Sequence, residues 1–159
     1  MVEKADAEVN QADYTERWAA VARALRQWAI AHSHEWALIY GSPVPGYAAP
    51  QDTIPAASRL GVVLLTILSE AGSASTSKPA KSLNKPKMTK AISASIASIR
   101  ALTDGAIPDT VLVDALGAWS QLIGLINMEL FGHFVNVVDD PDQFYGESVR
   151  RLGVSLNLP

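Results

Sequence analysis

The stretch AWSQLIGLINMELFGHF, from Ala118 to Phe134, decides the fold that this sequence predicts. Its apolar residues recur at helical spacing, and the same pattern extends back to Pro108, but the apolar positions cover more than one face. A helix that is apolar on several sides must be buried on several sides. We therefore expect one long helix over Pro108–Phe134 at the centre of the molecule, with Pro108 at its first position.

Amphipathic helical patterns flank this central helix. They begin after Asp13 and Ser33, near Ile54 and Met88, and after Asp140, with Asp13, Ser33 and Asp140 as the expected helix caps. The alternating apolar pattern of a half-buried strand does not occur in the sequence. The sequence predicts an all-α fold, a single-domain bundle of about six helices over residues 1–159.

One stretch, Gly72–Lys87 (GSASTSKPAKSLNKPK), differs in composition from the rest. Serine, lysine and proline dominate it, and it holds a single leucine. Such a small apolar area does not offset the conformational entropy lost when a segment becomes ordered. We expect residues 72–87 to form a flexible loop.

The composition excludes several classes of protein. An apolar content of 48% supports a packed core, while a net charge of -3 argues against a DNA-binding surface, which needs a clustered basic face. Without cysteine, neither disulfides nor thiolate metal sites can form, in keeping with a cytoplasmic protein. The first ten residues lack the apolar region of a signal peptide. The longest strongly apolar runs, Leu60–Leu68 and Leu122–Leu130, are roughly half as long as a membrane crossing requires, so we expect no membrane.

Catalytic motifs are missing from the sequence. It contains no glycine-rich phosphate loop, no HExxH zinc motif and no nucleophile elbow. The one metal-like cluster, His32–Glu35, places two histidines across an expected helix boundary, where their side chains diverge, and a solvated turn is the simpler interpretation. We expect neither an enzyme nor a metal or cofactor site.

Aromatic residues from several elements point to binding or to core packing. Trp18, Trp28, Trp36, Tyr40, Tyr47 and Trp119 form this set. Large aromatic side chains either fill a core or form the walls of a ligand pocket. We expect Trp18 and Trp28 in the core, and the sequence leaves both interpretations open for Trp36 and Tyr40.

A stripe of glycines marks one side of the long helix. Gly117, Gly124 and Gly132 recur at spacings of seven and eight. Glycine inside a helix is less favourable than alanine by about 1 kcal/mol. Three of them in one helix therefore favour the close approach of a second backbone or of a ligand.

Two stretches resemble the C-terminal domain of TetR-family bacterial transcriptional regulators, in the variant named for a Trp-His-Gly motif. WAIAHSHEWALIYGSPVPGYAAP (Trp28–Pro50) resembles the family's helix, turn and proline-rich loop, and Ala118–Phe134 resembles its long dimerisation helix. Trp119 and Gly124 match the motif, while Ile123 stands where the histidine would be.

The resemblance implies an effector-binding and dimerisation domain. A small hydrophobic or aromatic ligand would bind between the first amphipathic helix, the Leu60–Leu68 helix and the long helix. The expected ligand-binding residues are Trp36, Tyr40, Leu64, Trp119 and Ile123. A two-fold homodimer would form through the long helix and the last helix. The expected interface residues are Gly117, Gly124, Met128, Gly132, Phe144 and Val149.

The N-terminal end of the chain departs from the family pattern. In the family, a three-helix DNA-binding domain with a helix-turn-helix precedes the regulatory domain, whereas residues 1–13 alone precede the first amphipathic helix here. We therefore expect no DNA-binding domain in this chain. The alternative function is a helical protein–protein interaction module whose solid core holds no small-molecule pocket.

Overall fold

A computed structural model describes residues 1–42, 45–46, 50–74, 87–101, 103 and 107–158. Within these ranges it contains α-helices, one 3-10 turn and no β-strand, so the predicted all-α fold is confirmed. The elements are α1 (Val2–Ala7), α2 (Tyr14–Ala31), α3 (Ser33–Tyr40), η1 (Gln51–Thr53), α4 (Ile54–Ala74), α5 (Lys90–Ser95), α6 (Ala97–Ala101), α7 (Asp109–Leu130) and α8 (Pro141–Ser155).

Eight α-helices are described where about six were expected. The short α1 falls in the charged segment Val2–Ala12, whose sequence favours a short helix outside the six amphipathic ones. The other additional helix arises because the helix expected from Met88 is interrupted at Ile96, which separates α5 from α6. The additional elements do not change the fold class.

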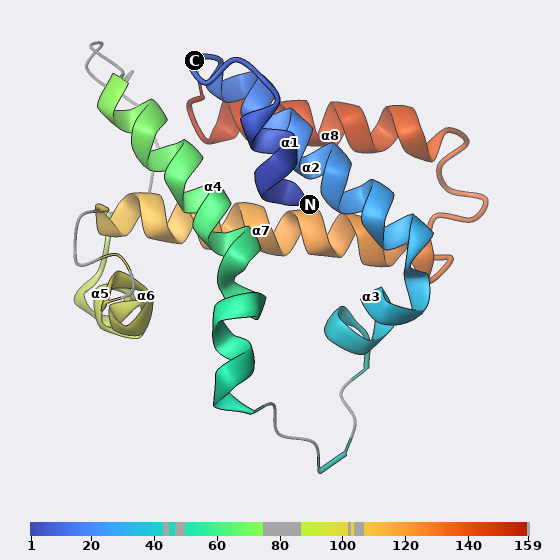
Figure 1. Cartoon of the computed structure of the whole chain (residues 1–159), viewed down its shortest axis with the longest axis horizontal. Coiled ribbons are helices and arrows are strands. Elements are labelled where there is room, and N and C mark those ends of the chain that lie inside the picture. The colour runs from blue at the N-terminus through green and yellow to red at the C-terminus, as the bar shows by residue number, and fades with distance from the viewer. Residues whose placement is uncertain (43–44, 47–49, 75–86, 102, 104–106, 159) are drawn as a thin grey trace.

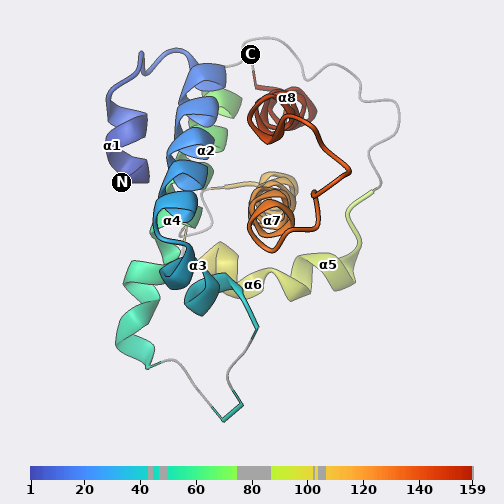
Figure 2. The same cartoon turned by 90° about the vertical axis from the view of Figure 1, so that its right-hand side faces the viewer.

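Helix α7 lies at the centre of the bundle. α8 runs antiparallel beside it, and α2 and α4 pack against this pair from one side (Figure 1). Viewed nearly along α7 and α8, α1 lies outside α2, while α5 and α6 lie below α7 (Figure 2). The apolar central helix α7 contacts α2, α3, α4, α6 and α8, while Gly117, Gln121 and Met128 on its remaining face are exposed.

The main core fills the space between α2, α4, α7 and α8. Its largest fully buried residues include Trp18, Val21, Leu64, Ile67, Leu122 and Ile126. The polar atoms of the buried aromatic residues have partners, as burial demands. The Trp18 indole nitrogen donates to the Val149 carbonyl at 2.8 Å, and the Tyr145 hydroxyl donates to the Ala22 carbonyl at 3.0 Å. Both bonds fasten α2 to α8.

Two of the three expected helix caps are confirmed. The side chains of Asp13 and Asp140 each accept a backbone hydrogen bond of 2.9 Å, from Glu16 and Gln143. The expectation for Ser33 was wrong, because α3 begins at Ser33 itself and no side chain caps it.

The ends of the central helix differ from the prediction. Pro108 precedes α7 as its N-cap, with an extended ψ of 142°, and Asp109 is the first helical residue. α7 ends at Leu130 and not at Phe134. Gly132 follows with a φ of +77°, in the left-handed region that glycine adopts without steric cost. This turn explains Gly132, which therefore does not belong to a glycine stripe on the helix.

The flexible loop expected over residues 72–87 was predicted to begin at a position that is still helical. Gly72, Ser73 and Ala74 are the last residues of α4, and residues 75–86 lie outside the part of the chain that the structure describes.

Two helices are long and apolar enough to cross a membrane by length and composition. They are Gln51–Ala74 and Asp109–Leu130, each with a mean hydropathy of 1.4. The prediction that no apolar segment is long enough for a membrane crossing considered only the shorter, strongly apolar runs within these helices. The core helices of a soluble protein pass the same test. Ile67 and Ile126 on these helices are each 0% exposed in the main core, and 35% and 33% of the two apolar windows are buried within this chain.

Candidate ligand-binding site

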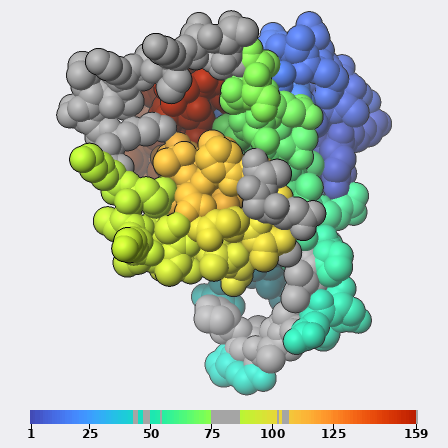
Figure 3. All heavy atoms as spheres, turned by 90° about the vertical axis from the view of Figure 1, so that its left-hand side faces the viewer, coloured from blue at the N-terminus to red at the C-terminus, as the bar shows by residue number. Residues whose placement is uncertain are grey.

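A cavity of about 550 Å³, partly open to solvent, lies between α4, α6 and α7. In the side view of the molecule in Figure 3, the start of α7 is visible between α4 and the α5–α6 segment. Small residues face the cavity from both long helices: Ala57 and Gly61 on α4, and Ala115 on α7. Because these positions carry little or no side chain, the two helices do not fill the space between them. The volume lies in the range of small-molecule sites, roughly 300–1,000 Å³.

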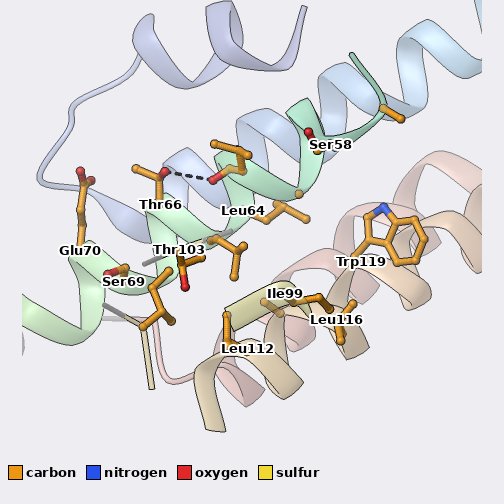
Figure 4. Close-up of a pocket in the computed structure, with 16 residues that line it drawn as sticks. Ser58, Leu64, Thr66, Ser69, Glu70, Ile99, Thr103, Leu112, Leu116 and Trp119 are labelled. Atoms are coloured by element: carbon orange, nitrogen blue, oxygen red, sulfur yellow. Dashed lines mark hydrogen bonds between the residues drawn. The ribbon is translucent and has the colours of Figure 1, made fainter. Parts of the chain in front are cut away.

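The walls of the cavity are mainly apolar. The large apolar and aromatic lining residues are Val62, Leu64, Leu65, Ile99, Ile107, Leu112, Leu116 and Trp119. Several of them belong to a second, smaller core formed around Ile96, Ile107 and Leu112, each less than 9% exposed. One wall of the cavity is thus a packed part of the fold. The view along the cavity places Trp119 at one end (Figure 4).

Polar groups line the cavity chiefly along α4. They are Ser58, Thr66, Ser69 and Glu70, joined by Thr103 after α6. The hydroxyls of Ser58, Thr66 and Thr103 donate to backbone carbonyls three or four residues earlier, at 3.1, 2.9 and 3.0 Å. Figure 4 marks the bond of Thr66 and shows Glu70 at the end of the cavity opposite Trp119.

Glu70 is also part of an ion-pair network that reaches α1. Its carboxylate pairs with Arg17 Nη1 at 2.5 Å, and Arg17 binds both oxygens of Asp6, at 2.7 and 3.1 Å. Arg17 is only 2% exposed. The hydrogen bonds that Arg17 donates to Asp6 raise the pKa of Arg17 most, against the effect of burial, and the bond that it donates to Glu70 raises the pKa further. The guanidinium therefore stays charged and joins α1, α2 and the end of the cavity.

The outer wall of the cavity is fastened to the N-terminus of α7 by a polar cluster. Arg100 of α6 binds Asp109 through Nε and Nη2, both at 2.7 Å. The Ser93 hydroxyl of α5 also donates to Asp109. These two partners, Arg100 first, hold the pKa of the Asp109 carboxyl below its usual value. The cluster keeps Ile99 and Thr103 in place over the cavity.

The structure brings two of the five expected ligand residues to this cavity. Leu64 and Trp119 line it. Trp36 is 0% exposed, and its indole donates to Asn127 Oδ1 at 2.7 Å, while Ile123 is 9% exposed in the main core. Tyr40 packs against Trp36 with the two rings tilted and their centroids 4.5 Å apart, and its ring centroid lies 6.5 Å from that of Trp119. Burial raises the pKa of the Tyr40 hydroxyl, while a hydrogen bond with Trp119 lowers it. These three residues lie behind Trp119 and not on the cavity wall.

The cavity is walled by α6 where the sequence suggested α2. The inner face of α2 is filled by Trp18, Val21 and Leu25, each less than 5% exposed, which leaves no space there. Sequence reasoning missed Ile99, Leu112 and Leu116 as lining residues. The sequence did contain a signal for a cavity beside α4. Ala57 and Gly61 are one helical turn apart and leave a gap on one face of this helix.

The expected dimer residues fall into three groups. Gly124 and Met128 line a shallow groove between α7 and α8, and an added Cβ at Gly117 or Gly124 would meet no atom within 4 Å. Phe144 is 40% exposed beside Phe134, with which it makes an edge-to-face contact. Val149 is 3% exposed and packs within this chain's own core, where it has little surface to offer to a second copy.

Among the described residues, no group of three or more histidines or acidic residues comes together in a way that could hold a metal ion. The acidic residues near the cavity are engaged with arginines.

Comparisons with known proteins agree on one family. Residues 18–152 match the family model described as "Tetracyclin repressor-like, C-terminal domain". The chain is 31% identical over 135 residues to the HTH-type transcriptional regulators Mb1846 of Mycobacterium bovis and Rv1816 of Mycobacterium tuberculosis. Each alignment covers 84% of this chain and 56% of the relative, so the chain spans about half the length of the curated relatives it matches.

A solved structure supports the same assignment. The crystal structure of SCO4313, a protein assigned provisionally to a regulatory role, superposes with a TM-score of 0.64 at 26% identity. The match covers 95% of this chain and 69% of that one.

Proposed function

Because this chain belongs to the family of tetracyclin repressor-like C-terminal domains, which serve transcription regulation and not catalysis, we propose that it senses a small molecule. The ligand binds in the cavity between α4, α6 and α7. The observation that carries this proposal is the cavity itself, with a volume of about 550 Å³ and mainly apolar walls. A helical interaction module with a solid core would not need such a space.

The ligand of this proposal is hydrophobic or aromatic. Apolar walls favour apolar ligands because burial contributes about 25 cal/mol for each Å² removed from water. Leu64 and Trp119, which were expected at the site from the sequence, both offer such surface.

A thermal-shift screen of aromatic and lipophilic compounds tests ligand sensing. A ligand present at one hundred times its Kd adds about 2.7 kcal/mol to the free energy of unfolding. For a domain of this size that corresponds to a rise in Tm of roughly 5–10 °C. A broad screen without any such shift would reject the sensor function and leave the protein–protein interaction module in its place.

We also propose that the chain forms a two-fold homodimer through α7 and α8. The groove between these helices, lined by Gly124 and Met128, and the exposed Phe144 ring support a self-complementary face. Such an interface buries on the order of 2,000 Å² in total. Sedimentation equilibrium at low micromolar concentration should give twice the mass of the chain, and a monomer mass would reject the proposal.

Contact with DNA, in this proposal, is made by a helix-turn-helix region of the kind that the relatives' names indicate and not by the surface of this chain. The chain carries a net charge of -3, which opposes phosphate binding. Ligand binding would then act on DNA affinity through a coupling between two sites, in the cytoplasm, where the DNA is. A gel-shift titration in about 150 mM salt should detect no sequence-selective binding by this chain, and sub-micromolar selective binding would refute this division of roles.

A further inference from the structure

The polar edge of the cavity offers hydrogen-bond acceptors. A hydroxyl has one proton to donate, and the hydroxyls of Ser58, Thr66 and Thr103 have already donated theirs to backbone carbonyls. Their remaining capacity is as acceptors. The Glu70 carboxylate also only accepts. The Ser69 hydroxyl, the fourth on this edge, can donate as well as accept, so acceptors outnumber donors here and favour a ligand that brings its own donors.

The described lining of the cavity carries a negative charge and no positive one. Of the lining residues that the structure describes, none is lysine, arginine or histidine, and Glu70 alone is charged. Its partner Arg17 is bound on its other side by Asp6, so one cation is shared by two carboxylates and the trio has one net negative charge. This arrangement favours a positively charged group near Glu70 and disfavours an anion.

The charged surface and the aromatic surface lie at opposite ends of the cavity. Glu70 lies at one end and Trp119 at the other, with Leu64, Leu112 and Leu116 between them (Figure 4). The Glu70 side chain is 50% exposed, so a charged group beside it remains in contact with water and avoids the cost of full burial.

We propose that the ligand is a small hydrophobic amine. Its apolar or aromatic body lies toward Trp119, and its ammonium group binds the Glu70 carboxylate at the other end. This inference rests on the proposed sensor function and adds the chemical class of the ligand. Fatty acids and other hydrophobic carboxylates are the class that the cavity rejects.

Isothermal titration of the whole chain at pH 7 with three matched compounds tests the ligand class. 4-Phenylbutylamine, 4-phenylbutan-1-ol and 4-phenylbutyrate share one aromatic body and differ in the end group. We expect the amine to bind about tenfold more tightly than the alcohol, because a charge-assisted hydrogen bond at a half-exposed site contributes modestly, and the carboxylate to bind most weakly.

Two results overturn the amine class. The first is that the alcohol or the carboxylate binds at least as tightly as the amine. In that case the sensor function stands and only the proposed chemical class of the ligand is wrong. The other is a lack of binding by all three compounds, after which the broad thermal-shift screen decides separately whether the cavity senses any ligand.

A pair of variants identifies the group that selects the amine. Glu70→Gln and Asp6→Asn each remove one of the two carboxylates that bind Arg17, but only Glu70 lines the cavity. We expect Glu70→Gln to reduce the preference for amine over alcohol to about twofold or less, and Asp6→Asn to reduce it less, because Asp6→Asn cancels the net charge of the trio but leaves the Glu70 carboxylate at the cavity. An equal loss in both variants, or none in Glu70→Gln, would show that Glu70 does not bind the ligand. If either variant unfolds at the assay temperature, the binding order of the three compounds to the unaltered chain decides alone.

Discussion

Gly61→Leu should block the cavity without damaging the fold. Gly61 lies in the middle of α4 and lines the cavity, and a Cβ built there meets no atom within 4 Å. Leucine is a better helix former than glycine by about 0.8 kcal/mol. For a chain of this length the variant should therefore melt roughly 2–3 °C higher than the unaltered protein.

The effect of the same substitution on ligand binding has the opposite sign. The new side chain occupies space that the ligand's apolar body would fill. A ligand that loses the burial of two methylene groups loses about 1.6 kcal/mol, which is roughly a fifteenfold rise in Kd. Isothermal titration with the tightest compound from the screen measures this change, and differential scanning calorimetry measures the Tm.

Gly72→Leu provides the matched control. Gly72 is on the same helix, an added Cβ there also meets no atom within 4 Å, and it does not line the cavity. The control should raise the Tm slightly, because it lies in the last turn of α4, and should leave Kd unchanged. If Gly61→Leu binds ligand as tightly as Gly72→Leu does, the ligand does not occupy this cavity and the reasoning fails.

Three further substitutions or conditions have definite expected outcomes. Trp36→Phe removes the donor to Asn127 Oδ1 and leaves a void in the core, so urea unfolding should show a loss of about 2–3 kcal/mol in the free energy of unfolding. A loss below about 1 kcal/mol would mean that this contact matters little. The pKa of Asp109 is lowered from 3.8, so its contribution to stability is complete above pH 3.8 and is lost as the pH falls through the lower, folded-state value. Melting curves from pH 2 to 6 should show a smaller acid dependence in Asp109→Asn, and identical curves would contradict this. Gly124→Leu should raise the dimer dissociation constant at least about tenfold in sedimentation equilibrium, while Gly72→Leu should not; equal effects would place the interface elsewhere.

Helix positions followed well from the sequence because they depend on local signals. Asp13 and Asp140 satisfy backbone donors in their own first turns, and such bonds involve residues three positions apart. One local signal was overlooked at the end of the long helix. α7 stops at Leu130 because Gly132 can take a left-handed conformation, and the helical apolar pattern through Phe134 concealed that turn.

The cavity was harder to predict than the helices that enclose it. Among the family-derived candidates, Leu64 and Trp119 line the cavity, and their contact with a ligand stays a prediction. Trp36 shows why the others could not be placed: a tryptophan fits a pocket wall and a core equally well, and only its bond with Asn127, 91 residues away, distinguishes them. Ile99 and Leu112 reach the cavity through packing between helices far apart in the chain, which no local pattern encodes.

The central claim is that a small molecule binds between α4, α6 and α7. Methyl NMR of the chain during titration with 4-phenylbutylamine tests it most directly, because the cavity wall is rich in assignable methyl groups. We expect saturable shift changes at Ile99, Leu112 and Leu116, which line the cavity, and little change at the exposed Leu38 and Val137. Shift changes confined to the exposed methyl groups, or none at the cavity wall up to millimolar ligand, would contradict the account.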